Sequence, residues 1–128
     1  MAPELFEFIE SSEASESRNA QAADMWALGE ITVQMLTKEP TFKNVSLLLN
    51  YVRSPSSFPS ATLRTRGTSE VGIKFINSIM QPKPEDRRTS SEAMSHVWIS
   101  SYLSRISGTT PNVLAEYVLP SSELLKYR

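Results

Sequence analysis

Apolar residues recur at helical spacing through most of the chain, and no stretch of any length alternates as a β-strand does. The longest such segment runs from Asp24 to about Thr37. Its apolar side chains fall on most of the circumference, which predicts a helix buried on nearly all sides at the centre of a domain. They are Trp26, Ala27, Leu28, Ile31, Val33, Met35 and Leu36. Asp24 is a suitable N-cap, because its carboxylate accepts the free N–H groups of a first helical turn.

Two further helices are predicted over 44–53 and 69–81, separated by a loop rich in Ser, Pro and Thr that extends to about residue 68. Each helix ends just before a proline, Pro55 in the first case and Pro82 in the second. Their apolar residues, spaced by three and four, are Val45, Leu48, Leu49 and Val52, and then Val71, Phe75, Ile76, Ile79 and Met80.

Another helix is predicted to begin at Thr89, where the sequence Thr-Ser-Ser-Glu has the spacing of a capping box. Its apolar stripe comprises Ala93, Met94, Val97 and Trp98. A short helix over 2–9, a loop rich in Ser and Glu to about residue 22, and short helices near 112–118 and 121–127 complete an all-α fold.

The composition of these 128 residues suits one soluble domain with a real core, since 40% of them are hydrophobic. The absence of cysteine excludes disulfides, thiolate zinc sites and cysteine nucleophiles. The N-terminal segment is acidic, unlike a signal peptide, and no apolar run approaches the roughly 18 residues of a membrane helix. We therefore expect a cytoplasmic or nuclear protein that does not enter a membrane.

The net charge of −1 is unevenly distributed. Residues 1–24 hold six acids and Arg18, a balance of −5, while the remaining residues hold eight acids and twelve bases, a balance of +4. The acidic stretch is typical of a solvated loop, because acids three residues apart oppose a stable helix. The arginines do not form the basic stripe that nucleic-acid binding requires, so no nucleic-acid partner is expected.

Few residues could carry catalysis. The single histidine, His96, is predicted to be a packed or surface side chain next to Trp98. The four glycines form neither a Gly-x-Gly-x-x-Gly loop nor a Walker loop, and no Gly-x-Ser-x-Gly elbow is present. We assign no catalytic, cofactor-binding or metal-binding residue.

Several motifs in a fixed order resemble the C-terminal lobe of a eukaryotic protein kinase, over about residues 2–101. They are Ala2-Pro3-Glu4, Asp24-x-Trp26-x-x-Gly29, the exit Lys38-Glu39-Pro40-Thr41-Phe42, Pro84-Glu85-Asp86-Arg87 and the His96-x-Trp98 ending. The resemblance implies the family's helices F, G, H and I. It divides the chain into a partial kinase domain, 1–103, without the N-lobe and catalytic loop, and a C-terminal tail, 104–128. It also leans toward the calcium/calmodulin-dependent and related serine/threonine kinases.

Carried over to this chain, the resemblance gives structural roles to five residues. Glu4 is expected to form a buried ion pair with Arg87. Asp24 is expected to accept hydrogen bonds from the backbone of the catalytic loop, and Trp26 to pack beneath that segment. Gly29 is expected to let another element approach the helix closely.

Three positions depart from the family pattern. Arg88 stands where the family usually has proline. Gln34 replaces a glutamate that several kinases with basic substrates carry, which weakens the case for an arginine-directed specificity. Glu30 is a charge in a helix predicted to be buried, so it is expected to face a surface.

The parent family transfers phosphate from ATP, with Mg²⁺, to serine or threonine in proteins. The Gly-rich loop, the N-lobe lysine and its glutamate partner, the His-Arg-Asp loop and the Asp-Phe-Gly motif are not found in the sequence. Phosphoryl transfer depends on positioning and charge stabilisation by those parts. The chain is therefore interpreted as a truncated kinase domain, with Met1 an internal methionine of a longer protein, and as inactive by itself.

The alternative is a stand-alone interaction module derived from a kinase C-lobe. Helix G and its neighbouring loops are docking surfaces in many kinases. A protein partner or kinase substrate is therefore expected near Asn44–Arg53 in either case.

Overall fold

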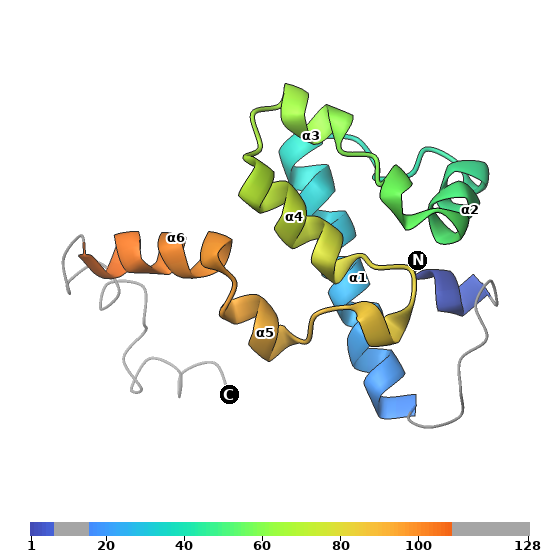
Figure 1. Ribbon diagram of the computed structural model, residues 1–128, viewed down its shortest axis with the longest axis horizontal. Coiled ribbons are helices and arrows are strands. Elements are labelled where there is room, and N and C mark those ends of the chain that lie inside the picture. Colours follow the sequence, from blue (N-terminus) through green and yellow to red (C-terminus); the bar gives the residue numbers. More distant parts are fainter. Residues whose placement is uncertain (7–15, 109–128) are drawn as a thin grey trace, which may run out of the picture.

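The structure is a computed structural model that describes residues 1–6 and 16–108, and every element in those ranges is helical (Figure 1). The elements are η1 (Pro3–Phe6), α1 (Glu16–Thr37), α2 (Val45–Arg53), η2 (Pro55–Ser57), α3 (Ala61–Thr65), α4 (Glu70–Ile79), η3 (Pro84–Asp86), α5 (Ser90–Met94) and α6 (Val97–Gly108). The predicted all-α class is confirmed. The helices predicted near 112–118 and 121–127 lie outside the described residues.

Helices α1 and α4 form the central pair, and α4 crosses α1 at Gly29 (Figure 1). A Cβ atom at Gly29 would collide with Cγ of Met80 and lie 2.7 Å from its Sδ. The close approach expected at Gly29 is therefore present, and the element that approaches is the end of α4.

Helix α1 begins earlier than predicted, at Glu16 rather than after Asp24. The prediction that Asp24 is an N-cap and that a loop continues to residue 22 is therefore wrong. Residues 16–23 include three alanines and a glutamine, which are good helix formers and outweigh the like charges on which the loop was predicted. At the N-terminus of the chain, the described part of the helix predicted over 2–9 is a single 3₁₀ turn, Pro3–Phe6.

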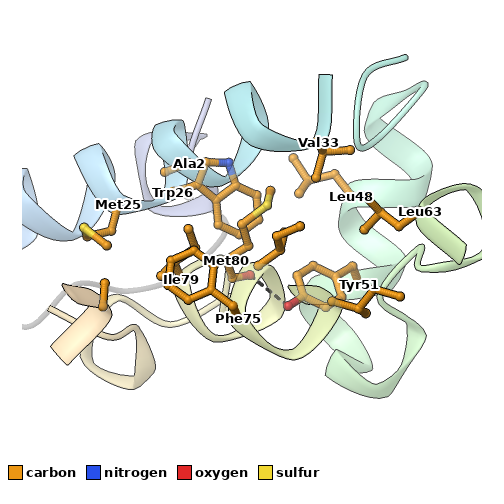
Figure 2. Packing of buried hydrophobic residues seen from close by; sticks show 13 residues of the cluster. Ala2, Met25, Trp26, Val33, Leu48, Tyr51, Leu63, Phe75, Ile79 and Met80 are labelled. Atoms are coloured by element: carbon orange, nitrogen blue, oxygen red, sulfur yellow. Dashed lines mark hydrogen bonds between the residues drawn. The ribbon is translucent and has the colours of Figure 1, made fainter. Parts of the chain in front are cut away.

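The core lies between α1, α2 and α4 (Figure 2). Trp26, Tyr51, Ile76, Ile79 and Met80 are fully buried. The hydroxyl of Tyr51 lies 2.8 Å from the Met80 carbonyl oxygen, to which it donates, so the one polar atom of this ring is satisfied at the end of α4. Burial raises the pKa of Tyr51, which keeps the phenol protonated as this bond requires.

The predicted helix starts at Asn44, Ser69 and Thr89 are confirmed. The side chain of Asn44 accepts the Leu47 N–H, and that of Ser69 accepts the Gly72 N–H. Thr89 and Glu92 form the reciprocal capping box, with N···O distances of 2.8 and 3.2 Å. The backbone N–H of Thr89 also lowers the pKa of Glu92.

Two short helices, η2 and α3, occupy the segment predicted as a loop before residue 68. Leu63 of α3 is fully buried, and α3 contacts α1. One buried leucine in five residues is not a periodic pattern, so this helix is stabilised by tertiary packing and not by a local signal.

The helix predicted from Thr89 through Trp98 is divided into α5 and α6. The Nδ1 atom of His96 accepts the backbone N–H of Trp98 at 3.2 Å, which starts a new helix. Trp98 then packs against Phe75, with ring centroids 5.2 Å apart. Because of the break, Met94 and Val97 are 59% exposed each, and the continuous apolar stripe predicted for them is wrong.

We predict that Gly29→Ala destabilises the folded chain, by about 1–3 kcal/mol as is typical of overpacking. Alanine favours helix by up to about 1 kcal/mol over glycine, so a net loss reports the clash with Met80. Denaturant unfolding of Gly29→Ala in the wild-type and Met80→Ala backgrounds measures it. In the Met80→Ala background, Gly29→Ala is expected to be neutral or stabilising. Stabilisation in both backgrounds would contradict the close approach.

Candidate functional site

Arg87 lies at the junction of three segments and is completely hydrogen-bonded. A guanidinium has five N–H donors. Two of them reach the two carboxylate oxygens of Glu4, at 2.7 Å each. The others reach the backbone carbonyls of Ala22, Gln81 and Pro82 at 3.0, 2.6 and 3.0 Å. The residue therefore joins η1, the first half of α1 and the exit from α4.

The Glu4–Arg87 pair expected from the resemblance is present and buried, with side-chain exposures of 5% and 0%. The guanidinium carbon also lies 5.0 Å from the centroid of the Trp26 ring, a cation–π distance. Trp26 in turn donates its indole N–H to Glu30 at 3.0 Å. The four side chains form one connected group, which we call the Arg87 cluster.

Glu30 has a role that the sequence prediction did not assign. Its side chain is 29% exposed, as expected for a charge that faces a surface, and it satisfies the only polar atom of the buried Trp26 ring. It also lies 3.3 Å from the amino nitrogen of Met1. The four-residue spacing of Trp26 and Glu30 on a helix is the signal that could have identified this contact.

The opposite face of α1 is apolar and uncovered within the described part of the chain. Leu28, Ile31 and Met35 are 46%, 55% and 68% exposed. We call these three residues the open stripe. The prediction that α1 is buried on nearly all sides is therefore wrong: α3, α4 and η3 pack on α1 and leave this face uncovered.

Asp24 lies on the same face as the open stripe, at spacings of four, seven and eleven residues. It is exposed, and its carboxylate forms no hydrogen bond or ion pair with the part of the chain that the structure describes. Trp26 does not share this face, since it is fully buried in the core. The packing of Trp26 beneath the catalytic loop stays a prediction, because that segment is not found in residues 1–128.

The exit from α1 packs onto the core through Phe42. Its ring stacks on Trp26 with centroids 6.0 Å apart and on Tyr51 at 5.4 Å. Lys38, just after α1, has a φ of +63°, which turns the chain back toward this ring. The Pro-x-Phe exit thus links α1 with α2.

Helix α2 presents part of its surface to solvent. Val45 and Leu47 are 53% and 46% exposed, whereas Leu48 and Tyr51 on the same helix are buried. The region predicted to meet a partner, Asn44–Arg53, therefore has two accessible apolar side chains in the first turn of α2.

The described residues contain no group of three or more His, Asp or Glu side chains that could hold a metal ion. His96 packs against the ring of Phe75, and burial, together with the charge of Arg88, lowers its pKa. Its packed environment agrees with the structural role predicted for it. No helix in the described ranges is long and apolar enough to cross a bilayer.

Comparison with known proteins shows similarity to protein kinases. Residues 1–99 match the family model of the protein kinase domain. The chain is 33% identical over 90 residues to serine/threonine-protein kinase 17A of Oryctolagus cuniculus, a match that covers 63% of this chain and 21% of that protein. It is 29% identical over 118 residues to a calcium/calmodulin-dependent protein kinase of Metarhizium anisopliae, covering 90% of this chain and 27% of the relative. The chain thus spans about a quarter of the relatives' length or less.

One solved structure, the Rad53 kinase domain and SCD2 in complex with AMPPNP, shares the fold. The TM-score is 0.59 at 27% identity, over 77% of this chain and 36% of that chain. The match of a chain whose described elements are all helical to part of a kinase domain agrees with the predicted helical C-lobe.

We predict that Glu4→Ala and Arg87→Ala each destabilise the fold by about 3–5 kcal/mol, because each leaves its partner charged and buried. Arg87→Ala is expected to cost more, since three backbone carbonyls also lose a donor. The double mutant is expected to cost much less than the sum. Denaturant unfolding of the four proteins measures the coupling, and Glu70→Ala, which removes an exposed pair with Arg64, is the control with little effect. Additive losses at Glu4 and Arg87 would contradict the pair.

Proposed function

The chain belongs to the protein kinase domain family, and we propose that residues 1–128 by themselves do not catalyse phosphoryl transfer. In this proposal they supply the helical half of a serine/threonine kinase C-lobe, which supports a catalytic loop and faces the protein substrate. The observation that carries the proposal is the difference between two faces of α1. The face that carries Trp26 and Glu30 is packed against the rest of the chain, and we call it the completed face. The face that carries Asp24 and the open stripe is uncovered in the described residues, and we call it the open face.

The completed face of α1 contributes Trp26 and Glu30 to the Arg87 cluster. All four side chains of the cluster are structural. The five N–H groups of Arg87 are used on Glu4 and on backbone carbonyls. Glu30 accepts from the Trp26 indole and pairs with the Met1 amino group, so none of the charged groups of the cluster is left to act on a nucleotide. The motifs by which the family binds ATP and Mg²⁺ are not found in residues 1–128. Without them, neither the positioning nor the charge stabilisation that phosphoryl transfer needs is available.

The open face has the properties of a surface that another part of a kinase domain covers. It combines three large apolar side chains with an acid, Asp24, whose oxygens have no donor in the described residues. The resemblance implies that Asp24 accepts hydrogen bonds from the backbone of the catalytic loop. The open stripe lies along the same helix face, so one covering segment would satisfy both.

The second candidate function is a non-catalytic interaction module. The exposed apolar residues of α2, Val45 and Leu47, favour it, since a protein partner could dock there without any nucleotide. Sequencing the transcript upstream of Met1 distinguishes the two. A continuing frame with His-Arg-Asp and Asp-Phe-Gly would support the kinase C-lobe, and a stop codon would favour the module.

We predict that residues 1–128 do not bind ATP. Titration calorimetry with Mg-ATP is expected to give no saturable heat, because no phosphate loop, lysine or metal-binding aspartate is supplied. A complete serine/threonine kinase domain titrated in the same buffer is the positive control. Saturable binding at micromolar concentration would overturn the proposal.

We also predict that the isolated chain self-associates through the open stripe. Burying one such side chain contributes about 1.5–3 kcal/mol, and three of them lie on one face. Sedimentation of wild type and of Ile31→Gln/Met35→Gln is the measurement, and the variant is expected to shift toward monomer. Val45→Gln/Leu47→Gln is the matched control on α2. A wild type that remains monomeric and melts in one sharp transition at high temperature would favour the interaction module.

A further inference from the structure

Four serines have an arginine three residues before them: Ser56, Ser69, Ser90 and Ser91. Protein kinases discriminate substrates by charge pattern, and an arginine before the acceptor serine is recognised by carboxylates through charge-assisted hydrogen bonds. The sequence alone does not choose among these serines. The structure does, because it determines which arginines are available.

Arg87 cannot be presented to an enzyme in the folded chain. Its side chain is fully buried and all five of its N–H groups are hydrogen-bonded. Ser90, which depends on Arg87, is therefore excluded. Ser91 retains only Arg88, and Ser56 has only Arg53.

Ser69 is preceded by two accessible arginines, Arg66 at three residues and Arg64 at five. Arg66 is exposed and forms no ion pair with the described residues. The side chain of Arg64 is 53% exposed, although it pairs with Glu70 at 2.6 Å and donates to the Ser60 hydroxyl at 2.7 Å. Both positive charges therefore lie on the surface, within five residues of the exposed Ser69.

The segment that carries these residues can reach an active site by local opening of the two helix ends that flank it. It is the turn between α3 and α4, at the periphery of the helices (Figure 1). Gly67 has a φ of +85° and no atom within 4 Å of where a Cβ would lie. Leu63 is the last buried anchor before it, and Gly72 and Ile73 of α4 are the first buried residues after it, so the end of α3 and the first turn of α4 have to open.

We propose that Ser69 is a phosphorylation site for an arginine-directed serine/threonine protein kinase. In the reaction the Oγ atom of Ser69 forms a bond to the γ-phosphorus of ATP, and the bond from that phosphorus to the β–γ bridging oxygen breaks. ADP leaves, and the hydroxyl proton passes to a base of the enzyme.

The product would reverse the local charge of the turn. Arg64, Arg66 and Glu70 sum to +1, and a phosphoserine adds about −1.5 to −2. Ser69 already accepts the Gly72 N–H at the start of the ten-residue helix α4, where negative charge is favoured. The phosphate would compete with Glu70 for Arg64. Arg64 is therefore expected to exchange its ion pair with Glu70 for one with the phosphate.

Incubating the full chain with a purified kinase that selects Arg at three and five residues before serine, with Mg-ATP, tests the proposal. Tandem mass spectrometry is expected to place the phosphate on Ser69. Ser69→Asn, which keeps an N-cap side chain, is expected to abolish that phosphopeptide. Arg64→Ala and Arg66→Ala are each expected to slow incorporation roughly tenfold or more.

Two controls separate selection by structure from sequence alone. Arg88→Ala is expected to leave the rate at Ser69 unchanged. A synthetic peptide covering residues 84–95, in which Arg87 is free but Glu85 stands five residues before Ser90, is expected to be phosphorylated slowly at Ser90, while the folded chain is not phosphorylated there. No phosphate on Ser69, rates at Ser69 insensitive to both arginines, or preferential modification of Ser90 or Ser91 in the folded chain would each overturn the proposal.

Discussion

A guanidinium removed from water in a small domain requires an acceptor for each of its five N–H groups, and Arg87 finds them in three separate segments. Two of the acceptors are carbonyls of the chain leaving α4, one belongs to α1, and the last two are the oxygens of Glu4. The distances therefore constrain three backbone segments at once. Removing any one segment would leave a buried charge incompletely paired, which costs several kcal/mol. This requirement explains why Glu4, 83 residues away in sequence, is held at 2.7 Å.

The Arg87 cluster also determines which face of α1 becomes the interior. Trp26 lies against the guanidinium, so its side of the helix is turned toward α4, and Gly29, one turn later, meets Met80. Leu28, Ile31 and Met35 then necessarily face away. A helix with apolar residues all round shows no preferred face in its own pattern. The choice of face is made by the ion pair and by the one glycine that permits close packing.

Local signals in the sequence predicted local structure well. Helix starts at Asn44, Ser69 and Thr89 were predictable because a cap is formed by residues within three positions of one another. The Glu4–Arg87 pair was predictable only through the family resemblance, since no local pattern links positions so far apart. The early start of α1, the short helix α3 and the break at His96 were missed. The early start reflects helix formers in residues 16–23 that outweigh the like charges, so the signal was present and was misjudged. The helix α3 and the packing of Trp98 after the break depend on contact with other elements, as Leu63 and Trp98 illustrate, and a local pattern does not report such contacts.

The open stripe affects association more than folding. Leu28, Ile31 and Met35 are largely accessible in the folded chain and also in the unfolded one, so their transfer from water contributes little to the difference between the two states. What the isolated chain lacks is the additional stabilisation that a covering segment would supply. The buried face, with its paired charge and its satisfied Tyr51 and Trp26, already closes the core on the other side. The chain therefore has a well-packed core and an exposed apolar stripe on α1. An exposed stripe of this kind favours binding, either to other copies of the chain or to a protein segment that covers α1.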